Sequence, residues 1–180
     1  MKHLYFVRHG LSEANKKGVW SGSVNTPLSP EGHEQAKHAG QLAREQGIVF
    51  DVVLSSPLDR AHHTAQHISR ETSYPIQDII LHKDLRERHF GVLEGTNSAD
   101  VFEQYLKDEA AIDLYKDVER LVDMQWRAQQ VLEYLHTLPH DTVLVVAHGA
   151  FGRALRRAIN KDPLHERLQP IPNAQIIKFI

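Results

Sequence analysis

The sequence contains no cysteine. Disulfide scaffolds, thiolate zinc sites and cysteine nucleophiles are therefore excluded. Long hydrophobic runs are also missing: no stretch approaches the length of a membrane-spanning helix, and the first apolar run, Leu4 to Val7, is too short for the core of a signal peptide. We therefore expect a cytoplasmic protein with no membrane partner.

An excess of charge of either sign is absent as well. The 180 residues include 21 Lys and Arg and 23 Asp and Glu, which gives a formal net charge of −2. This balance argues against nucleic acid or an anionic membrane as a partner, whereas a locally basic pocket for a small anion stays compatible with it. We find no repeat, low-complexity tract or linker, and the length suits one domain, so we predict a single domain over residues 1–180.

Short apolar runs alternate with segments of helical periodicity along the chain. Strands are predicted at 4–7, 52–54, 79–81, 142–147 and 176–180, and helices at 29–47, 56–70, 118–135 and 151–159. The first two predicted helices begin with Ser29-Pro30 and Ser56-Pro57, which each combine an N-cap hydroxyl with a proline at the first helical position. Residues 11–28 lack periodicity and are predicted to form a long loop. The alternation predicts an α/β fold, a three-layer α/β/α sandwich with a mostly parallel central sheet.

Polar motifs follow three of the predicted strands. Arg8-His9-Gly10 follows the first strand, residues 55–60 follow the second, and His148-Gly149 follows the fourth. In parallel sheets, ligands bind beyond the carboxyl ends of the strands. The sequence therefore predicts a site at this edge of the sheet.

The residue types in these motifs suit phosphoryl transfer. The guanidinium groups of Arg8 and Arg60 match phosphate oxygens, and the first turn of a helix, where Arg60 is predicted to lie, also favours an anion. A neutral imidazole such as that of His9 can attack phosphorus and form phosphohistidine. His148 would hold a phosphoryl oxygen, as a charged or as a neutral donor, and so stabilise the transition state.

A leaving alkoxide needs a proton, and Glu87 follows the third predicted strand at a suitable place. Its carboxyl group would have to hold a proton near neutrality, which a bound phosphate dianion beside it would favour. Two other acids, Asp84 and Glu94, lie close in sequence. Arg86 and Arg88 are interpreted as structural or rim residues that can pair with Glu87.

These residues lie in motifs that resemble those of the histidine phosphatase superfamily, in its phosphoglycerate mutase-like branch. Arg8-His9-Gly10 with Ser12 and Asn15 resembles the RHG signature. Further blocks that resemble the family, in family order, are Ser21-Gly22 with Pro27-Leu28-Ser29 and Gly32 to Ala36, Ser55 to Ala61 with Thr64-Ala65, Leu85 to Gly91 with Glu94-Gly95, and Val146 to Gly149 with Arg153. Together they cover most of the chain outside residues 96–140.

The resemblance implies a phosphoglycerate mutase-like fold and a role for each matching residue. His9 would be the phosphorylated nucleophile, and Glu87 would donate a proton and later activate water. The phosphate pocket would be formed by Arg8, Arg60 and His148, and further substrate or phosphate contacts would come from Asn15, Ser21, Gly22 and Gly149. The family needs no metal, and nothing in the sequence asks for one. We also expect no cofactor.

Two departures from the family pattern bear on the reaction. The acidic residue usual in the first loop is replaced by Ser23-Val24-Asn25, so the contacts of this loop are expected to differ. Mutases also carry a paired-arginine segment before the last histidine, whereas residues 96–140 hold only the isolated Arg120 and Arg127. We expect a short cap-like segment at about 96–125 that leaves the phosphohistidine open to water. This favours a metal-independent phosphatase for a small phosphate monoester over a mutase.

Three alternatives stay open: a cofactor-dependent phosphoglycerate mutase, a phosphohistidine protein phosphatase, and a phosphate-binding module with little turnover. The presence of both His9 and Glu87 argues against the last of them. The sequence does not specify the physiological substrate, and a monomer and a homodimer are equally compatible with it.

Some residues carry little information by themselves. The chain has 13 histidines, so a histidine outside a motif is not a site. His63 and His67 share a helical face at a spacing that can bind zinc, but no third ligand at matching spacing accompanies them, and we expect no metal site. Trp20 and Trp126 are predicted to lie in the core, with the wall of a substrate pocket as the alternative.

Overall fold

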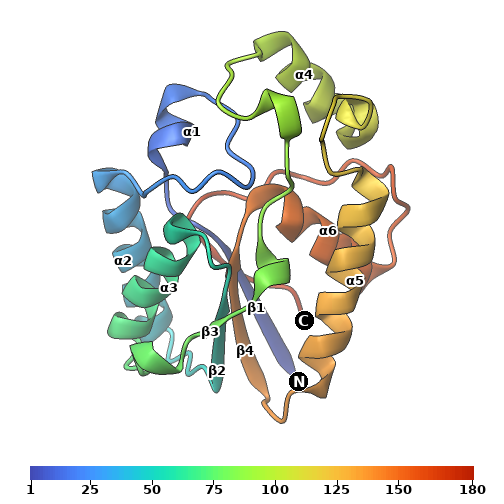
Figure 1. Ribbon diagram of the computed structural model, residues 1–180. Helices are drawn as coiled ribbons and strands as arrows, with labels where there is room; N and C mark the ends of the chain where they lie inside the picture. The colour runs from blue at the N-terminus through green and yellow to red at the C-terminus, as the bar shows by residue number, and fades with distance from the viewer.

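A five-stranded sheet with strand order β3-β2-β4-β1-β5 lies at the centre of the structure, a computed structural model that describes residues 1–180 (Figure 1). Its strands are β1 (His3–Arg8), β2 (Val52–Ser55), β3 (Ile80–Leu81), β4 (Thr142–Ala147) and β5 (Ile176–Lys178). The first four run parallel to their neighbours, and β5 pairs with β1 in the antiparallel direction. The predicted mostly parallel sheet is confirmed.

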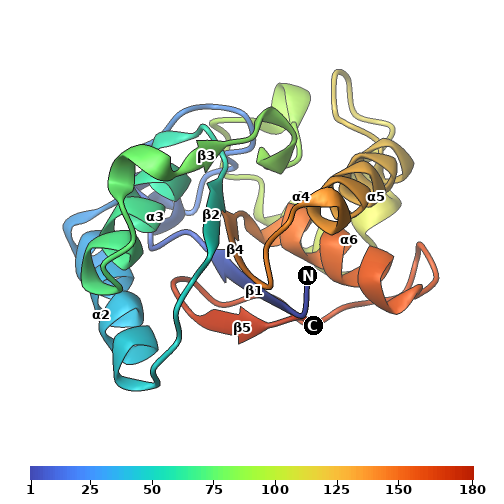
Figure 2. The same ribbon diagram turned by 90° about the horizontal axis from the view of Figure 1, so that it is seen from below.

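Helices cover both faces of this sheet. They are α1 (Glu13–Lys17), α2 (Pro30–Glu45), α3 (Asp59–Glu71), α4 (Ala99–Lys107), α5 (Leu121–Thr137) and α6 (Gly149–Asn160). Figure 2 shows α2 and α3 on one side of the sheet and α5 and α6 on the other, which confirms the three-layer α/β/α arrangement. None of the helices combines the length and the apolar character needed to cross a membrane.

The central strand β4 explains why the layers form. Val143 and Val145 belong to the apolar cluster beneath α5 and α6, whereas Leu144 and Val146 belong to the cluster beneath α2 and α3. Successive side chains of a strand point to opposite faces, and here both faces are covered by helices. The strand therefore has a continuous apolar sequence, and all four side chains are fully buried.

The predicted helix boundaries agree with the structure in one case and differ in three. Ser29 is the N-cap of α2, and its hydroxyl accepts a hydrogen bond from the amide of Gly32 at 3.1 Å. The helix α3 begins two residues beyond Pro57, because Ser56 turns its hydroxyl toward His148 instead of capping the helix. The start of α5 is delayed to Leu121, since residues around Val118 bridge to Phe90, and α6 begins already at Gly149.

Two segments contain helices that the sequence analysis did not predict. The loop at 11–28 contains α1, which Ser12 and Asn15 begin with a reciprocal capping box. The segment 96–120 contains α4 and the 3-10 helix η4 (Glu109–Ile112). Figure 1 places α1 and α4 above the end of the sheet at which β1 and β4 terminate. A third apolar cluster lies in this region, formed by Trp20, Phe90, Leu93, Tyr105, Ile112 and Val118.

Candidate active site

The ends of three parallel strands bring the predicted motifs together. In the register of the sheet, Arg8 lies opposite Ala147, and Ser55 lies opposite Val146. The backbone amide of His9 then donates to the carbonyl of Ala147 at 3.0 Å. His148 follows directly after β4, so the two histidines are neighbours because their strands are neighbours.

The imidazole of His9 is held with one nitrogen free. Its Nδ1 lies 2.7 Å from the carbonyl oxygen of Gly10, and because a carbonyl only accepts, Nδ1 carries the proton and Nε2 carries the lone pair. Burial, followed by the positive charges of Arg60 and Arg8, lowers the pKa of His9 well below its ordinary value. The side chain is therefore a neutral imidazole with an available Nε2, which is the form that attacks phosphorus.

His148 lies beside His9 and is also neutral. The two ring centroids are 5.1 Å apart with an angle of 62° between the planes, and Nε2 of His148 is 2.8 Å from the hydroxyl of Ser56. Burial, with the charge of Arg60 as the next cause, lowers the pKa of His148 well below its ordinary value. Of the two forms considered for this residue, the structure favours the neutral hydrogen-bonding one.

A cavity of about 580 Å³ opens next to His9. Six of the residues predicted for the site line it, namely Arg8, His9, Asn15, Ser21, Glu87 and Gly149. The other three, Gly22, Arg60 and His148, are not among the lining residues, and the last two are buried behind His9.

Arg60 faces the protein backbone in this arrangement. Its Nη2 donates to the carbonyls of Ser21 and Gly22 at 3.0 and 2.7 Å, and its Nη1 donates to that of Val24 at 2.9 Å. Burial lowers the pKa of Arg60 to about 10, which leaves it cationic at neutral pH. Backbone carbonyls occupy its guanidinium in this arrangement, and the expected phosphate contact of Arg60 stays a prediction.

Gly22 is packed against the backbone and not against the cavity. A Cβ atom at this position would lie 2.2 Å from the carbonyl oxygen of Arg88. The close approach leaves room only for glycine. Gly22 thus fixes how the loop packs on the Arg88 segment, and its expected contact with substrate stays a prediction.

Arg8 and Glu87 form the charged wall of the cavity. Nη1 of Arg8 donates to the carbonyl of Ile171 at 3.0 Å, while its buried Nε has no partner within the protein. Burial lowers the pKa of Arg8, and the negative charge of Glu87 opposes this shift. The Glu87 carboxylate accepts hydrogen bonds from the amides of Ala150 and Phe151 at 3.2 and 3.0 Å, which fixes it at the N-terminus of α6.

Several positioning residues were not predicted. The amide of Gly10 donates to the hydroxyl of Thr64 at 3.0 Å, and the side-chain amide of Asn173 donates to the carbonyl of His9 at 2.7 Å. Thr64 was visible as part of a family-like block, but its partner was not. Asn173 lies in a segment without periodicity, where no sequence signal marks it.

Glu94 binds the loop in which Ser23-Val24-Asn25 departs from the family pattern. Its carboxylate accepts hydrogen bonds from the amides of Ser23, Val24 and Phe90 at 2.9 to 3.0 Å. Burial alone would raise the pKa of Glu94, but these backbone donors outweigh it and lower the pKa. The side chain of Asn25 accepts from the amide of Asp59 at 2.8 Å, so the loop is pinned at both ends.

The histidines on the outer helices form a pair that the sequence analysis did not predict. Nδ1 of His33, on α2, lies 2.9 Å from Nε2 of His67, on α3. His63 is farther away, with its ring centroid 6.0 Å from that of His33. No three His, Asp or Glu side chains are arranged so that they could hold a metal ion.

The two tryptophans have different surroundings. Trp20 is buried in the third apolar cluster and lines the cavity, so the core and pocket interpretations both apply to it. Trp126 is 66% exposed on α5. The expectation of a core or pocket position was wrong for Trp126, because this residue lies on the face of α5 that points away from the sheet.

Comparisons with known proteins identify relatives of two kinds. The family model for the histidine phosphatase superfamily (branch 1) matches residues 4–179. A 2,3-bisphosphoglycerate-dependent phosphoglycerate mutase from Brucella canis is 38% identical over 168 residues, which cover 87% of this chain and 81% of the mutase.

Solved structures of phosphatases also resemble this fold. A mycobacterial glucosyl-3-phosphoglycerate phosphatase in complex with VO3 is 25% identical, with a TM-score of 0.85 over 99% of this chain and 92% of that one. A putative alpha-ribazole-5'-P phosphatase from Escherichia coli is 25% identical, with a TM-score of 0.82 over 99% of this chain and 90% of that one.

Proposed function

The chain belongs to branch 1 of the histidine phosphatase superfamily, and from this premise we propose that it is a metal-independent phosphatase that hydrolyses a small phosphate monoester through a phosphohistidine at His9. The observation that carries the proposal is the state of His9. Its hydrogen bond to Gly10 leaves Nε2 free, its pKa is lowered, and it lines a cavity together with Arg8 and Glu87.

The reaction has two displacement steps at phosphorus. In the first, Nε2 of His9 forms a bond to phosphorus while the bond to the ester oxygen breaks, and Glu87 gives its proton to that oxygen. In the second, Glu87 takes a proton from water, whose oxygen attacks the phosphohistidine and releases inorganic phosphate and neutral His9. Arg8 compensates the negative charge of the phosphoryl group in both steps.

The remaining predicted residues receive supporting roles in this proposal. Asn15, Ser21 and the start of α6 at Gly149 face the cavity and contact the substrate. Arg60 holds the loop around Gly22, and its charge helps to keep His9 neutral. His148 presents a neutral imidazole beside the nucleophile. Residues 1–180 act as one domain, in which the segment at about 96–125 forms a short cap over the cavity.

A phosphoglycerate mutase is the second candidate, and the 38% identity to the Brucella canis enzyme favours it. A mutase returns the phosphoryl group to a second hydroxyl, so it must bind a strongly anionic bisphosphate. Only two cationic side chains line the cavity, Arg8 and Arg153, and the second is ion-paired with Glu109. We therefore favour the phosphatase. No contact in the structure favours a phosphohistidine protein phosphatase.

The first experiment is hydrolysis of p-nitrophenyl phosphate in the presence of EDTA, with His9→Ala run in parallel. We expect turnover that survives EDTA and falls by on the order of 10³ or more in His9→Ala, because the variant has no nucleophile. His38→Ala is the matched control, since this histidine is exposed on α2. The phosphoryl group should also be trapped on the wild type alone.

Three results would change the conclusion. Interconversion of 3- and 2-phosphoglycerate stimulated by bisphosphoglycerate would establish the mutase. Loss of turnover with EDTA would rule out the metal-independent reaction. Tight binding of inorganic phosphate without hydrolysis of any ester would favour a binding module.

A further inference from the structure

The cavity beside His9 is much larger than a phosphate group. Its volume of about 580 Å³ falls in the range of about 300–1,000 Å³ that is typical of sites for larger organic ligands. A phosphoryl group at His9 and Arg8 occupies only one end. The other end is enclosed by the Trp20 loop, the Phe90 segment and α4, and these walls must recognise the alcohol part of the ester. This inference rests on the proposed phosphatase function.

Aromatic side chains form the far wall of the cavity. The ring of Trp20 lies at its centre, with centroid distances of 4.7 Å to Phe90, 5.4 Å to Tyr105 and 5.5 Å to Phe102. All three contacts are edge-to-face, the arrangement that aromatic pairs prefer. Trp20, Phe90 and Tyr105 are buried, so they hold the wall in place. All four side chains line the cavity.

The helix α4 adds apolar side chains that the protein itself does not cover. Phe102 is 47% exposed and Leu106 is 42% exposed, and both line the cavity. Covering apolar surface gains about 25 cal/mol per Å². Since Tyr105, on the same helix, is buried against Trp20 and Phe90, the exposed pair cannot turn inward without displacing it. A ligand that covers Phe102 and Leu106 would therefore gain affinity from this surface.

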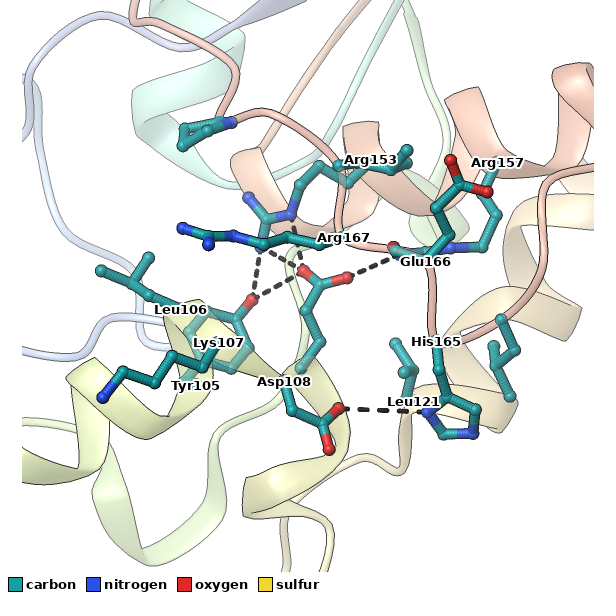
Figure 3. A pocket seen from close by; sticks show the side chains of 14 residues that line it. Tyr105, Leu106, Lys107, Asp108, Leu121, Arg153, Arg157, His165, Glu166 and Arg167 are labelled. Atoms are coloured by element: carbon teal, nitrogen blue, oxygen red, sulfur yellow. Dashed lines mark hydrogen bonds and ion pairs between the residues drawn. The ribbon is translucent and has the colours of Figure 1, made fainter.

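The charges of the far end do not suit a second anionic group. Arg153 is the only cation there, and its Nε and Nη2 donate to Glu109 and to the hydroxyl of Tyr105, each at 2.6 Å. Figure 3 shows Arg153 and the hydroxyl group of Tyr105 pointing toward each other in a smaller pocket that both residues also line. Glu109 also pairs with Arg157, and the carboxylate of Glu103 lines the cavity.

The polar groups that do face the far end are suited to a neutral ligand. Asn97 and Ser98 line the cavity at the start of α4 and offer amide and hydroxyl groups. Glu103 offers an acceptor for a donor group of the ligand. A carboxylate or a second phosphate placed here would meet Glu103 and would have to compete with Glu109 for Arg153, which is costly.

We infer that the substrate is a phosphate monoester whose alcohol part carries a planar ring without an acidic group, as an aryl-alkyl or nucleoside-like ester does. The phosphate lies at His9 and Arg8. The ring lies against Trp20 and Phe102, and its polar edge meets the groups at the start of α4. Recognition of the ring would then distinguish this enzyme from one that binds a small carboxylated phosphate ester.

The test compares esters whose leaving alkoxides have similar basicity, so that differences report binding of the alcohol part. We would measure kcat/KM of the full chain for 2-phenylethyl phosphate, propyl phosphate and 3-phosphoglycerate. We expect 2-phenylethyl phosphate to exceed propyl phosphate by about tenfold, since an aromatic pair contributes about 0.5–1.5 kcal/mol beyond burial of its area. We expect 3-phosphoglycerate to be the poorest substrate of the three.

Phe102→Ala sharpens the test, because the half-exposed Phe102 lines the cavity. Its ring also packs on Trp20, so the variant is judged by comparing two esters in the same protein. We expect it to raise KM for 2-phenylethyl phosphate about tenfold more than KM for propyl phosphate, with Phe102→Tyr restoring the preference. Leu114→Ala is the matched control: Leu114 is 96% exposed in the same cap and is not a lining residue.

The outcomes separate this inference from the proposed function. Equal kcat/KM values for the three esters would overturn the ring preference, and so would equal shifts of KM for 2-phenylethyl phosphate and propyl phosphate in Phe102→Ala. The proposed phosphatase function would still stand if this hydrolysis depends on His9. Efficient hydrolysis of 3-phosphoglycerate would also overturn it. If no ester is hydrolysed in a His9-dependent way, the proposed function fails and the inference fails with it.

Discussion

The end of the sheet and the cap above it contribute different parts of the site and are held by different forces. The sheet end carries His9, Arg8 and Glu87, and backbone groups fix it. The cap, residues 96–120, carries Phe102 and Tyr105 of the aromatic wall, and it is fastened to the rest of the protein by a few backbone hydrogen bonds, such as that from the amide of Glu119 to the carbonyl of His89, and by charged side chains. Backbone contacts thus place the reacting groups, whereas the cap depends on charged side chains in addition to its backbone contacts.

Close backbone packing positions the sheet end. A Cβ atom on Gly10 would lie 2.3 Å from the carbonyl oxygen of Gly32, and one on Gly32 would lie 2.1 Å from that of Leu11. The loop after β1 and the first turn of α2 therefore touch backbone to backbone. Since such a contact has little freedom to adjust, the nucleophile is presented by a rigid support.

A single arginine connects the cap to the segment that carries Glu87. Arg88 is fully buried, and its Nε and Nη1 donate to the carbonyls of Glu119 and Glu109 at 2.8 and 2.6 Å. It also forms an ion pair with Asp113. The residue next to the proposed proton donor thus binds the middle and the C-terminal end of the cap. We therefore expect that loss of Arg88 loosens the cap and leaves the end of the sheet intact.

The largest effect is expected at the sheet end, in Glu87→Gln. Glutamine has nearly the same shape and keeps one acceptor oxygen, although the amides of Ala150 and Phe151 bind different oxygens of Glu87, and it has no carboxyl proton to give. Loss of a general acid reduces the rate by on the order of 10²–10⁴. We expect this loss in kcat for an alkyl phosphate, and a smaller loss for p-nitrophenyl phosphate, whose leaving group needs less protonation.

The comparison of the two esters tests the role directly. Glu133→Gln, on the exposed face of α5, is the matched control. Equal losses for the alkyl and the nitrophenyl ester in Glu87→Gln would contradict proton donation and would reduce Glu87 to a positioning residue.

A smaller effect, about 3 kcal/mol on the free energy of unfolding, is expected from Arg88→Met. Methionine fills much of the same space but leaves Asp113 and two cap carbonyls without their partner, and breaking a buried pair costs about 3–5 kcal/mol. We take the lower end because the Asp113 side chain is 24% exposed. Urea unfolding measures the total, and hydrogen exchange should rise in residues 99–120 before it rises in β4.

Arg120→Met is the control for this variant. Arg120 pairs with Asp123 at 2.7 Å on the surface, where such a pair contributes little to the free energy of unfolding. If exchange in the cap of Arg88→Met stays at the wild-type rate, the cap is held by its apolar cluster and the proposed contrast between the two regions is wrong.

The same contrast explains what the sequence could predict. The run Val143 to Ala147 is apolar on both faces, so it predicted a buried strand, and the positions of β1 and β4 directly before the two histidines predicted that His9 and His148 meet. The helix α4 does carry apolar residues at helical spacing, Val101, Phe102, Tyr105 and Leu106, but it is only 9 residues long and buries only Tyr105, and no helix was predicted there. The long helices and strands of the core were easier to find in the sequence than this short helix at the surface.

The sequence also could not predict which groups the long side chains bind across the fold. Arg60 was predicted beside the site, but the sequence does not show that the carbonyls of Ser21 and Gly22 take its donors. Likewise, His67 was weighed with His63, although its partner is His33 on another helix. Which of two nearby groups a long side chain binds depends on distances of a few tenths of an ångström, and these follow only from the packed structure.

The last prediction concerns the pH dependence that the two buried histidines give to the sheet end. The pKa values of His9 and His148 are lowered in the folded protein, chiefly by burial, whereas unfolded histidine titrates near 6.5. Below about pH 6.5 the unfolded chain therefore binds more protons, and the free energy of unfolding falls as pH falls. Above that pH both states are neutral at these residues, and their contribution is constant.

The expected slope is about 1.4 kcal/mol per pH unit for each of the two histidines between about pH 5 and 6. Urea unfolding of His9→Asn should show a slope smaller by that amount than the wild type, with His38→Gln, on the exposed side of α2, as the control. Comparing slopes removes the contribution of other groups, including His67, whose pKa burial and His33 also lower. If the slope in His9→Asn equals that of the wild type, His9 takes up a proton in the folded protein as it does in the unfolded chain. The neutral nucleophile on which the proposed reaction depends would then be lost below pH 6.5.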